Sequence, residues 1–535
     1  MSESSTARGG HTDTGAPDTG LDRKVLIVAG VVVLGAIMSI LDVTVVSVAQ
    51  NTFQNTFNTN AAGAAWTMTG YTLALAAVIP LSSWAAARFG TKNVYIASLV
   101  LFTVGSALCA LAWNIGSLVA FRVVQGLGGG LLMPIGMMIM TKAAGPERVG
   151  SVMAVLGIPM LLGPIAGPIL GGLLIEKASW HWVFLINVPI GVIALVYSWF
   201  ALSSDEETSR PKIDIIGLLL LSPGLALFLY GISSSTDSGT FITTKVLVPS
   251  IVGAVLIIVF IWHALRAHNP LLDLRLFRNH TLRTAVITAT FFMTAFFGAS
   301  LLYPQYFIGV RGESTLAAGL LLAPQGLGAM LTMPISGRMT DKIGPGKFVL
   351  VGIVLLFFGM GAFIFLGADT SYWLLGGALF VQGLGMGMTM MPIMSAALAT
   401  LSSRQVPDGS TLVNVVQQTS SSIGTAVISV ILATGLKAHP ETLLGIASNA
   451  APEKYAAAVQ ASHAPGVPPA MQLPSTPPDQ WFTWAANAFG TPFIVAVVLV
   501  ALTFIPALFL PRTRIAAHPS HAGADGTAPT PTIMH

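Results

Sequence analysis

The segment VQGLGGGLLMP, residues 124–134, has a close counterpart in VQGLGMGMTMMP, residues 381–392. A second pair of related segments, PLSSWAAARFGTKNV at 80–94 and PISGRMTDKIGPGKF at 334–348, has nearly the same separation along the chain. Two pairs with a matching separation indicate an internal duplication. Duplicated halves are typical of secondary transporters, whose substrate path lies between the halves. The alternative is a simple helical bundle in which one packing motif occurs twice.

The composition indicates a membrane protein. Of the 535 residues, 54% are hydrophobic and only 9% are charged, whereas soluble proteins carry about 25% charged residues. The net charge of +4 does not indicate a nucleic-acid partner, because the basic residues flank apolar segments. The single cysteine, Cys109, cannot form an intramolecular disulfide. The chain has no GxxxxGKS/T loop, HExxH pair or GxSxG elbow, so neither a cofactor, a metal site nor an enzymatic activity is expected.

Fourteen segments are apolar over roughly the 20 residues that a transmembrane helix needs. They are 25–49, 66–86, 94–113, 117–141, 150–175, 184–202, 215–235, 246–265, 284–308, 317–337, 347–367, 372–399, 411–435 and 490–510. With this count, most of the 25 Lys and Arg residues fall on one side of the membrane. The positive-inside rule then places both termini in the cytoplasm. We therefore expect an all-α, multi-pass protein of the cell (cytoplasmic) membrane, acting as a monomer.

The repeat divides the fourteen helices into two sets of six with two extra helices between them, a 6 + 2 + 6 arrangement. The predicted parts are a disordered cytoplasmic tail (1–24), an N-terminal six-helix bundle (25–202), two inserted helices with their loops (203–283), a C-terminal six-helix bundle (284–510) and a second cytoplasmic tail (511–535). The C-terminal bundle includes a long outer loop, 436–489, whose segment PEKYAAAVQASH can form a helix.

One acid, Asp42, lies inside the first span, in SILDVTVVSVA, residues 39–49. Such a charge costs about 2.5–3.5 kcal/mol on insertion scales, and intramembrane acids usually face a polar path. Arg122 in the fourth span is expected at a similar depth, so an ion pair can form and the acid can carry a proton. The alternatives are a carboxylate that bonds only to the hydroxyl of Ser39 or Thr44, and an arginine that extends to the membrane surface.

Four segments resemble signatures of the major facilitator superfamily, and within it of the fourteen-helix drug:proton antiporters. They are LDVTVVSVA (41–49), RVVQGLGGG (122–130), GIPMLLGPIAGPILGG (157–172) and WHWVFLINVPIG (180–191). The resemblance covers about residues 22–512 and implies a major facilitator fold. It also implies multidrug efflux, and hence drug resistance, by a proton-coupled antiporter that exports lipophilic cationic or neutral compounds by alternating access. Asp42 and Arg122 would then serve proton coupling.

The resemblance further implies residues that gate the exchange between outward-facing and inward-facing states. These are Arg88, Gly163, Pro164, Gly167, Arg338 and Asp341. The first half departs from the family pattern, because Ala87 stands where the family usually has an acid and Ser83 where it usually has a glycine. This departure puts the charged latch of the first half in doubt.

Aromatic, methionine and glutamine side chains in the spans are candidate substrate contacts, because adaptable apolar side chains with a few polar groups suit varied lipophilic ligands. The candidates are Gln125, Phe291, Phe292, Met293, Phe296, Tyr303, Gln325 and Gln417. No acid is expected in the interior of the last six spans, because the acidic residues of that half are assigned to loops. These are Glu313, Asp341, Asp369 and Asp408.

Two other classes of function stay open. Within transport, the natural cargo can be an endogenous metabolite, a lipid or a siderophore. Outside transport, a membrane receptor or an intramembrane enzyme is disfavoured, because the spans contain no pair of a nucleophile and a base and both tails are short. The expected partners are therefore lipophilic small molecules, protons and the lipid bilayer.

Overall fold

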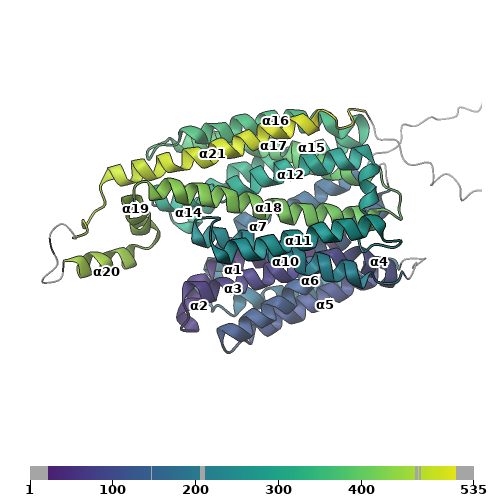
Figure 1. Ribbon diagram of the computed structural model, residues 1–535, viewed down its shortest axis with the longest axis horizontal. Helices are drawn as coiled ribbons and strands as arrows, with labels where there is room; N and C mark the ends of the chain where they lie inside the picture. Colours follow the sequence, from purple (N-terminus) through teal and green to yellow (C-terminus); the bar gives the residue numbers. More distant parts are fainter. Residues whose placement is uncertain (1–21, 146–147, 205–210, 464–467, 469–471, 514–535) are drawn as a thin grey trace, which may run out of the picture.

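The computed structural model describes residues 22–513 apart from 146–147, 205–210, 464–467 and 469–471. The regular secondary structure of these residues is entirely helical, and most helices lie side by side along the long axis of the molecule (Figure 1). The predicted tails, 1–24 and 511–535, fall almost wholly outside the described residues. The expected all-α architecture is confirmed.

The first part of the chain forms six long helical segments, some of them broken into shorter helices. They are α1 (Arg23–Val48), then α3 (Ala61–Val78) continued by η1 (Ile79–Leu81) and α4 (Ser82–Phe89), then α5 (Thr91–Ala110), α6 (Ile115–Ala144), α7 (Val149–Lys177), and α8 (Trp182–Leu185) followed by α9 (Asn187–Ala201). A short helix, α2 (Gln50–Thr56), follows α1. The helical hairpin of α10 (Ile215–Ser238) and α11 (Thr244–Arg266) corresponds to the two inserted helices.

The second part repeats this pattern. Its elements are η3 (Leu274–Arg278), α12 (His280–Ser300), α13 (Leu302–Gln305), the π-helical turn η4 (Tyr306–Val310), α14 (Thr315–Leu321), α15 (Ala323–Ile343), α16 (Pro345–Gly361), η5 (Ala362–Phe365), α17 (Tyr372–Ala399), α18 (Val406–Lys437), α19 (Glu441–Ala450), α20 (Pro452–Ser462) and α21 (Asp479–Ala507). The segment PEKYAAAVQASH forms α20, as the sequence suggested.

Thirteen helical segments of the described chain are long and apolar enough to cross a membrane. They match thirteen of the fourteen predicted spans. The predicted span 150–175 corresponds to α7, a helix of 29 residues that packs against α1, α15 and α17. Some side chains of α7 lie outside the described set. The place of α7 inside the bundle agrees with a fourteenth span, but the full count of fourteen stays a prediction.

Several predicted boundaries were wrong by more than a turn, among them two helix starts in the last part of the chain. The helix predicted at 411–435 begins at Val406, and the helix predicted at 490–510 begins at Asp479. Both helices therefore extend beyond their apolar stretches, through first turns that contain an acid. The outer loop is correspondingly shorter than 436–489 and contains α19 and α20. Apolar composition marks only the part of a helix that lies in lipid, so polar ends are missed.

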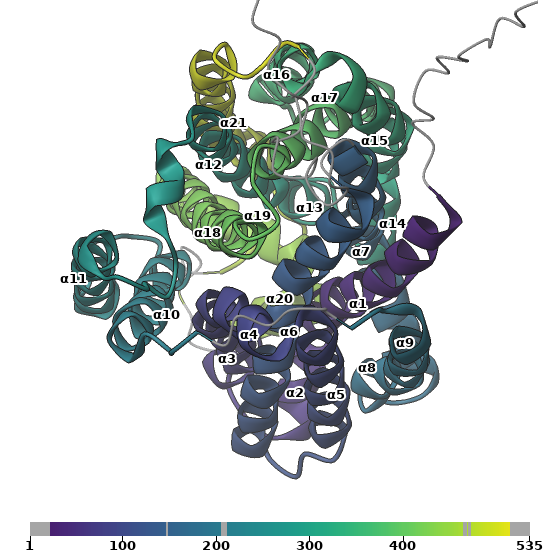
Figure 2. The ribbon, with the colours of Figure 1, turned by 90° about the vertical axis from the view of Figure 1, so that its right-hand side faces the viewer.

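The start of α1 and the end of α21 lie at one end of the bundle, together with α4 (Figure 1). We call this the basic end, because Arg23, Lys92, Lys342 and Arg512 are there. Helices α2, α19 and α20 lie at the opposite end. Figure 2, seen from the basic end, places α10 and α11 at the edge of the bundle, where α10 contacts α3 and α18.

The glycines of the repeated segment have the same packing role in both halves. A Cβ at Gly126 or Gly130 of α6 would lie 2.5 Å or 2.6 Å from a backbone oxygen of α3, and one at Gly128 would lie 2.5 Å from a backbone nitrogen of α5. In α17, a Cβ at Gly383 or Gly385 would collide with the backbone of α15 or α16. The repeat therefore encodes close helix contacts, which small residues allow, and not a phosphate loop.

Candidate functional site

Asp42 and Arg122 form an ion pair inside the bundle. Arg122 Nη1 donates to Asp42 Oδ2 at 2.5 Å, and both side chains are at most 1% exposed. Asp42 lies in the last third of α1 and Arg122 lies two turns after the start of α6, so both are nearer to the end opposite the basic end. The two charges lie at a similar depth, as expected, and they are in direct contact. The alternative, in which Arg122 extends to the membrane surface, is wrong for this structure.

Two amide side chains complete the coordination of the Asp42 carboxylate. Gln125 Nε2 donates to Asp42 Oδ1 at 2.8 Å, and Asn187 Nδ2 donates to the same oxygen at 3.1 Å. Asn187 Nδ2 also lies 3.2 Å from Ser106 Oγ. The carboxylate thus has donors from α6 and α9, one of them charged. Hydrogen bonds to a buried carboxylate offset part of the cost of removing it from water.

Arg122 has further partners that do not depend on Asp42. Its Nε donates to the carbonyl oxygen of Thr67 at 3.0 Å, and its Nη1 also donates to Gln125 Oε1 at 2.7 Å. The Tyr71 ring stacks on the guanidinium, with 4.1 Å from Cζ to the ring centroid. A desolvated cation over an aromatic face gains up to about 2 kcal/mol. The arginine would therefore keep an acceptor and an aromatic partner if the acid were neutral.

The hydroxyl alternative for Asp42 was wrong. Ser39 Oγ pairs with Tyr71 Oη at 3.3 Å, and Thr44 Oγ1 donates to the carbonyl oxygen of Ile40 in its own helix and to that of Gly163 in α7. Neither hydroxyl has a hydrogen bond to the carboxylate among the contacts of the described residues. The contact of Thr44 instead joins α1 to the helix that carries the predicted gating glycines.

Gly163 and Gly167 allow α7 to lie directly against α1. A Cβ at Gly163 would approach Ile40 to 2.1 Å, and one at Gly167 would approach Thr44 Oγ1 to 2.0 Å. The side chain of Pro164, the third predicted gating residue of this helix, lies outside the described set. The two glycines therefore set a tight α1–α7 contact one turn from Asp42.

Asp341 joins the two halves at the basic end. Its Oδ1 accepts from the Gly150 amide at 2.8 Å, and its Oδ2 accepts from the Ser151 amide at 2.9 Å and from Ser151 Oγ at 2.7 Å. The acid of α15 thus satisfies free amides in the first turn of α7, where a negative charge is also favoured by the helix dipole. Arg338, the predicted partner in gating, is exposed. Asp341 was expected in a loop but lies inside α15.

The first half uses hydroxyl groups at the corresponding place. Ser82 Oγ and Thr411 Oγ1 are 2.7 Å apart and fully buried, and Ser410 Oγ donates to the carbonyl oxygen of Pro134 at 2.8 Å. Arg88 is exposed. Asp408, which was also expected in a loop, lies in the first turn of α18. Contacts between α4, α6 and α18 thus close the basic end where the sequence left the charged latch in doubt, and they include a side-chain hydrogen bond between Ser83 of α4 and the acid Asp408 of α18.

Comparison with known proteins gives the family. Residues 32–425 match the family described as the Major Facilitator Superfamily. The "Multidrug resistance protein B homolog" of Mycobacterium tuberculosis (strain ATCC 25618 / H37Rv) is 46% identical over 519 residues, which cover 94% of each chain. The chain belongs to the major facilitator superfamily. As a member, it is a multi-pass membrane transporter, and the fold expected from the resemblance is confirmed.

A second relative by sequence and one solved structure also resemble this transporter. The "Lincomycin resistance protein LmrB" of Bacillus subtilis (strain 168) is 31% identical over 444 residues, covering 82% of this chain and 92% of the relative. The solved structure of the proton:xylose symporter XylE, bound to 6-bromo-6-deoxy-D-glucose, aligns with a TM-score of 0.56, covering 90% of this chain and 96% of that one. At 13% identity the XylE likeness concerns the fold alone.

The predicted substrate contacts occupy three different surroundings in this transporter. Gln125 belongs to the Asp42 site, where it is fully buried. Phe292, Met293 and Phe296 are buried in the core of the second half, and Phe291 lines a groove of about 460 Å³ between α12 and α21. Phe291 is thus separated from its neighbours in sequence, because α12 turns it toward the outer face of the bundle.

Three of the predicted polar contacts lie in the second half. Tyr303 Oη donates to Gln382 Oε1 at 2.8 Å, and both side chains are buried. Gln325 Nε2 and Gln417 Oε1 are buried atoms without a hydrogen-bond partner among the described residues. Gln417 also lines a small cavity with Met293 and Met394. These residues are not gathered into one site with Asp42.

Sequence reasoning missed Asn187 and Thr67 as parts of the acid site. Asn187 lies within the quoted segment WHWVFLINVPIG, and an amide flanked by apolar residues at the start of a span was the available signal. Thr67 contributes a main-chain carbonyl, which no residue pattern reveals. Both were hidden because the first, second and sixth spans meet only in the folded bundle.

Proposed function

We propose that this transporter is a proton-driven antiporter that exports lipophilic cationic or neutral compounds from the cytoplasm. The observation that carries the proposal is the buried Asp42 carboxylate, held by Arg122, Gln125 and Asn187. Intramembrane acids that face other helices are typical of proton relays. The names of the multidrug and lincomycin resistance relatives support drug-like cargo for this chain.

In proton exchange at Asp42, a proton would compete with the hydrogen-bond donors of the site for the carboxylate oxygens. The ionised carboxylate accepts hydrogen bonds from three side chains, whereas a protonated one would keep fewer of them. Arg122 would still hold Thr67 and Gln125, so its charge would not be left without a partner. The same acid could thus carry either a proton or the positive charge of a bound substrate, which gives an exchange of one for the other.

Alternating access requires two halves that rock against each other. We propose residues 25–202 and 284–510 as these halves, with 203–283 as an inserted pair and the basic end in the cytoplasm of a cell-membrane protein. The Asp341 contact with α7 and the Ser82–Thr411 contact would then form the closed cytoplasmic gate. Opening that gate breaks polar contacts at helix ends and leaves the Asp42 site intact.

The test is substrate-stimulated proton release in proteoliposomes with an imposed pH gradient. Wild-type protein should export a lipophilic cationic dye, and Asp42→Asn should reduce gradient-driven export to the level of protein-free liposomes. Glu176→Gln is the matched control, because Glu176 is an exposed acid that pairs with Lys177. Full gradient-driven export by Asp42→Asn would overturn the proposal. Retained binding of the dye by the Asn variant would show that the loss concerns coupling and not folding.

A further inference from the structure

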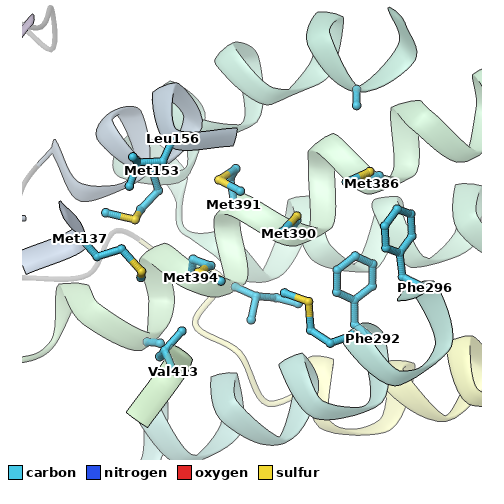
Figure 3. Packing of buried hydrophobic residues seen from close by; sticks show 14 of the residues in the cluster. Met137, Met153, Leu156, Phe292, Phe296, Met386, Met390, Met391, Met394 and Val413 are labelled. Carbon is cyan, nitrogen blue, oxygen red and sulfur yellow. The ribbon is translucent and has the colours of Figure 1, made fainter. Parts of the chain in front are cut away.

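Five methionines meet between the two halves near the basic end. Met137 of α6 and Met153 of α7 come from the first half, and Met333 of α15 and Met391 and Met394 of α17 come from the second half. Each is at most 6% exposed. We call these five residues the methionine cluster. Figure 3 shows Met137 and Met153 facing Met391 and Met394.

Specific contacts place these side chains across the interface. A Cβ at Gly157 of α7 would lie 2.5 Å from Met333 Sδ and 3.4 Å from Met391 Cε. Met137 Sδ lies 3.2 Å from Asn414 Nδ2 of α18. Sulfur atoms and terminal methyl groups of one half therefore touch backbone and side chains of the other half, and they fill the space that the glycine leaves open.

The cluster lies deeper than the polar latch but far from Asp42. Met153 follows Ser151, which binds Asp341, by two residues, and Met391 and Met394 lie within the last two to three turns of α17. Along α6, fifteen residues separate Arg122 from Met137, which is about 22 Å at 1.5 Å per residue. The cluster thus lies between the two halves, whereas the acid lies within the first half, nearer to the opposite end of the bundle.

Methionine is an unusual choice for a permanent core contact. Its unbranched, polarisable side chain adapts to irregular shapes and binds aromatic rings through sulfur, but it fixes a single packing less well than leucine does. An interface that must separate and close again gains from that adaptability. When the halves part at the basic end, the same side chains would become the walls of the opening.

We propose that the methionine cluster is a binding surface for the flat aromatic part of lipophilic substrates when the basic end is open, and a seal when it is closed. This inference rests on the proposed alternating access. It adds a division of roles, in which Asp42 interacts with substrate charge and the cluster interacts with an aromatic body. The substrate class is therefore polycyclic aromatic compounds, charged or neutral, in preference to purely aliphatic ones.

The test compares two monovalent cations of similar hydrophobicity, a tricyclic aromatic dye and a tetraalkylammonium ion, with reconstituted protein. Met391→Leu and the double variant Met153→Leu, Met391→Leu preserve volume and apolarity. The double variant should raise the KM for the aromatic cation about three- to tenfold, because two sulfur–aromatic contacts are lost. The KM for the aliphatic cation should stay within about twofold of wild type. Met360→Leu, in a buried position of α16, is the matched control.

A second measurement does not depend on transport. Peroxide converts accessible methionine to its sulfoxide, and peptide mass spectrometry follows each residue. The aromatic cation should slow oxidation of Met153 and Met391, and the aliphatic cation should not. The proposal would be overturned if the KM changed equally for both cations and neither cation selectively protected Met153 and Met391 from oxidation. The methionine cluster would then act only as a seal. If wild-type protein moves neither cation, the proposed function fails, and selective protection still decides whether the cluster binds aromatic ligands.

Discussion

Gln125 and Gln382 stand at equivalent places in the repeat but bind different partners. Gln125 Nε2 donates to the Asp42 carboxylate at 2.8 Å, whereas Gln382 Oε1 accepts from the Tyr303 hydroxyl at 2.8 Å. Both side chains are fully buried. The duplicated helix therefore presents the same amide to a charged group in the first half and to a neutral group in the second. The two halves share a fold, and among the residues that the structure describes the buried Asp–Arg pair belongs to the first half.

This difference predicts that the same Gln→Leu substitution has different effects at the two equivalent positions. Gln382→Leu leaves the buried Tyr303 hydroxyl without its partner, which costs about 1–3 kcal/mol of stability, but it should leave proton coupling unchanged. Gln125→Leu removes a donor to Asp42 and should reduce gradient-driven export. Melting temperature and coupled export in proteoliposomes measure the two effects. If Gln382→Leu abolished coupling while the protein stayed folded, the assignment of the acid site to the first half alone would be wrong.

Loss of the Asp341 charge should open the basic end more often. Asp341→Asn weakens three hydrogen bonds to the first turn of α7, and charged acceptors at such sites contribute about 1.5–3 kcal/mol. A reporter Ala154→Cys, in a Cys109→Ser background, should then react with a maleimide roughly tenfold faster. Ala154 is buried against Gly337 in the closed state. Glu313→Gln, at the other end, is the control. Equal labelling rates in all three proteins would show that Asp341 is no latch.

The hydrogen bonds of Asp214 should contribute to stability in a pH-dependent way. Burial would raise the pKa of its carboxyl, but hydrogen bonds from the Gly217 amide, His263 and the Leu271 amide outweigh burial and lower the pKa. Because the folded pKa lies below the unfolded value of about 3.9, the stabilisation is present above that value and is lost as pH falls through the folded pKa. Asp214→Asn should therefore lower the melting temperature at pH 7.

The same variant provides the pH test. The difference in melting temperature between wild type and Asp214→Asn should shrink as pH falls below about 4. Asp273→Asn, which removes a carboxylate but keeps a capping oxygen at the short turn η3, controls for general acid effects on the protein. A difference that stayed constant down to the lowest pH that the protein tolerates would contradict the lowered pKa of Asp214.

Monovalent cations should be exported better than bisquaternary cations of similar size. Asp42 is one buried acid, and burying a second positive charge without a second acid leaves that charge uncompensated. Asp341 is engaged by α7, and Asp408 lies in the first turn of α18. Parallel efflux of a mono-cationic and a bis-cationic dye from cells measures the preference. Equal or faster efflux of the bis-cation would refute the charge argument and direct attention to Asp408.

The sequence predicted the helices and the repeat well, because lipid demands long apolar segments and gives them a strong signal. It also placed Asp42 and Arg122 at one depth, from helix rise alone. It could not predict that Asn187 joins them, because the contact depends on how α9 packs against α1 and α5. The starts of α18 and α21 were predicted too late in the sequence, because their polar first turns resemble loops.

The substrate contacts were the least predictable part. Phe291, Phe292 and Met293 follow one another in sequence, yet the helix sends the first to the outer face and the others into the core. Composition shows that a span is aromatic but not which rings face a path, because neighbouring residues point about 100° apart on a helix. The methionine cluster was likewise hidden, since its members come from four helices.

The glycine contacts of α6 have a mechanical consequence. Because its backbone lies directly on that of α3 and α5, no layer of side chains is available there to slide or compress. Helix α6 therefore moves together with α3 and α5 when its half tilts. Arg122 lies toward one end of this three-helix unit and Met137 toward the other. A displacement at Arg122 would thus reach Met137 through the packed unit as a whole, past Pro134, which interrupts the backbone hydrogen bonds of α6 itself.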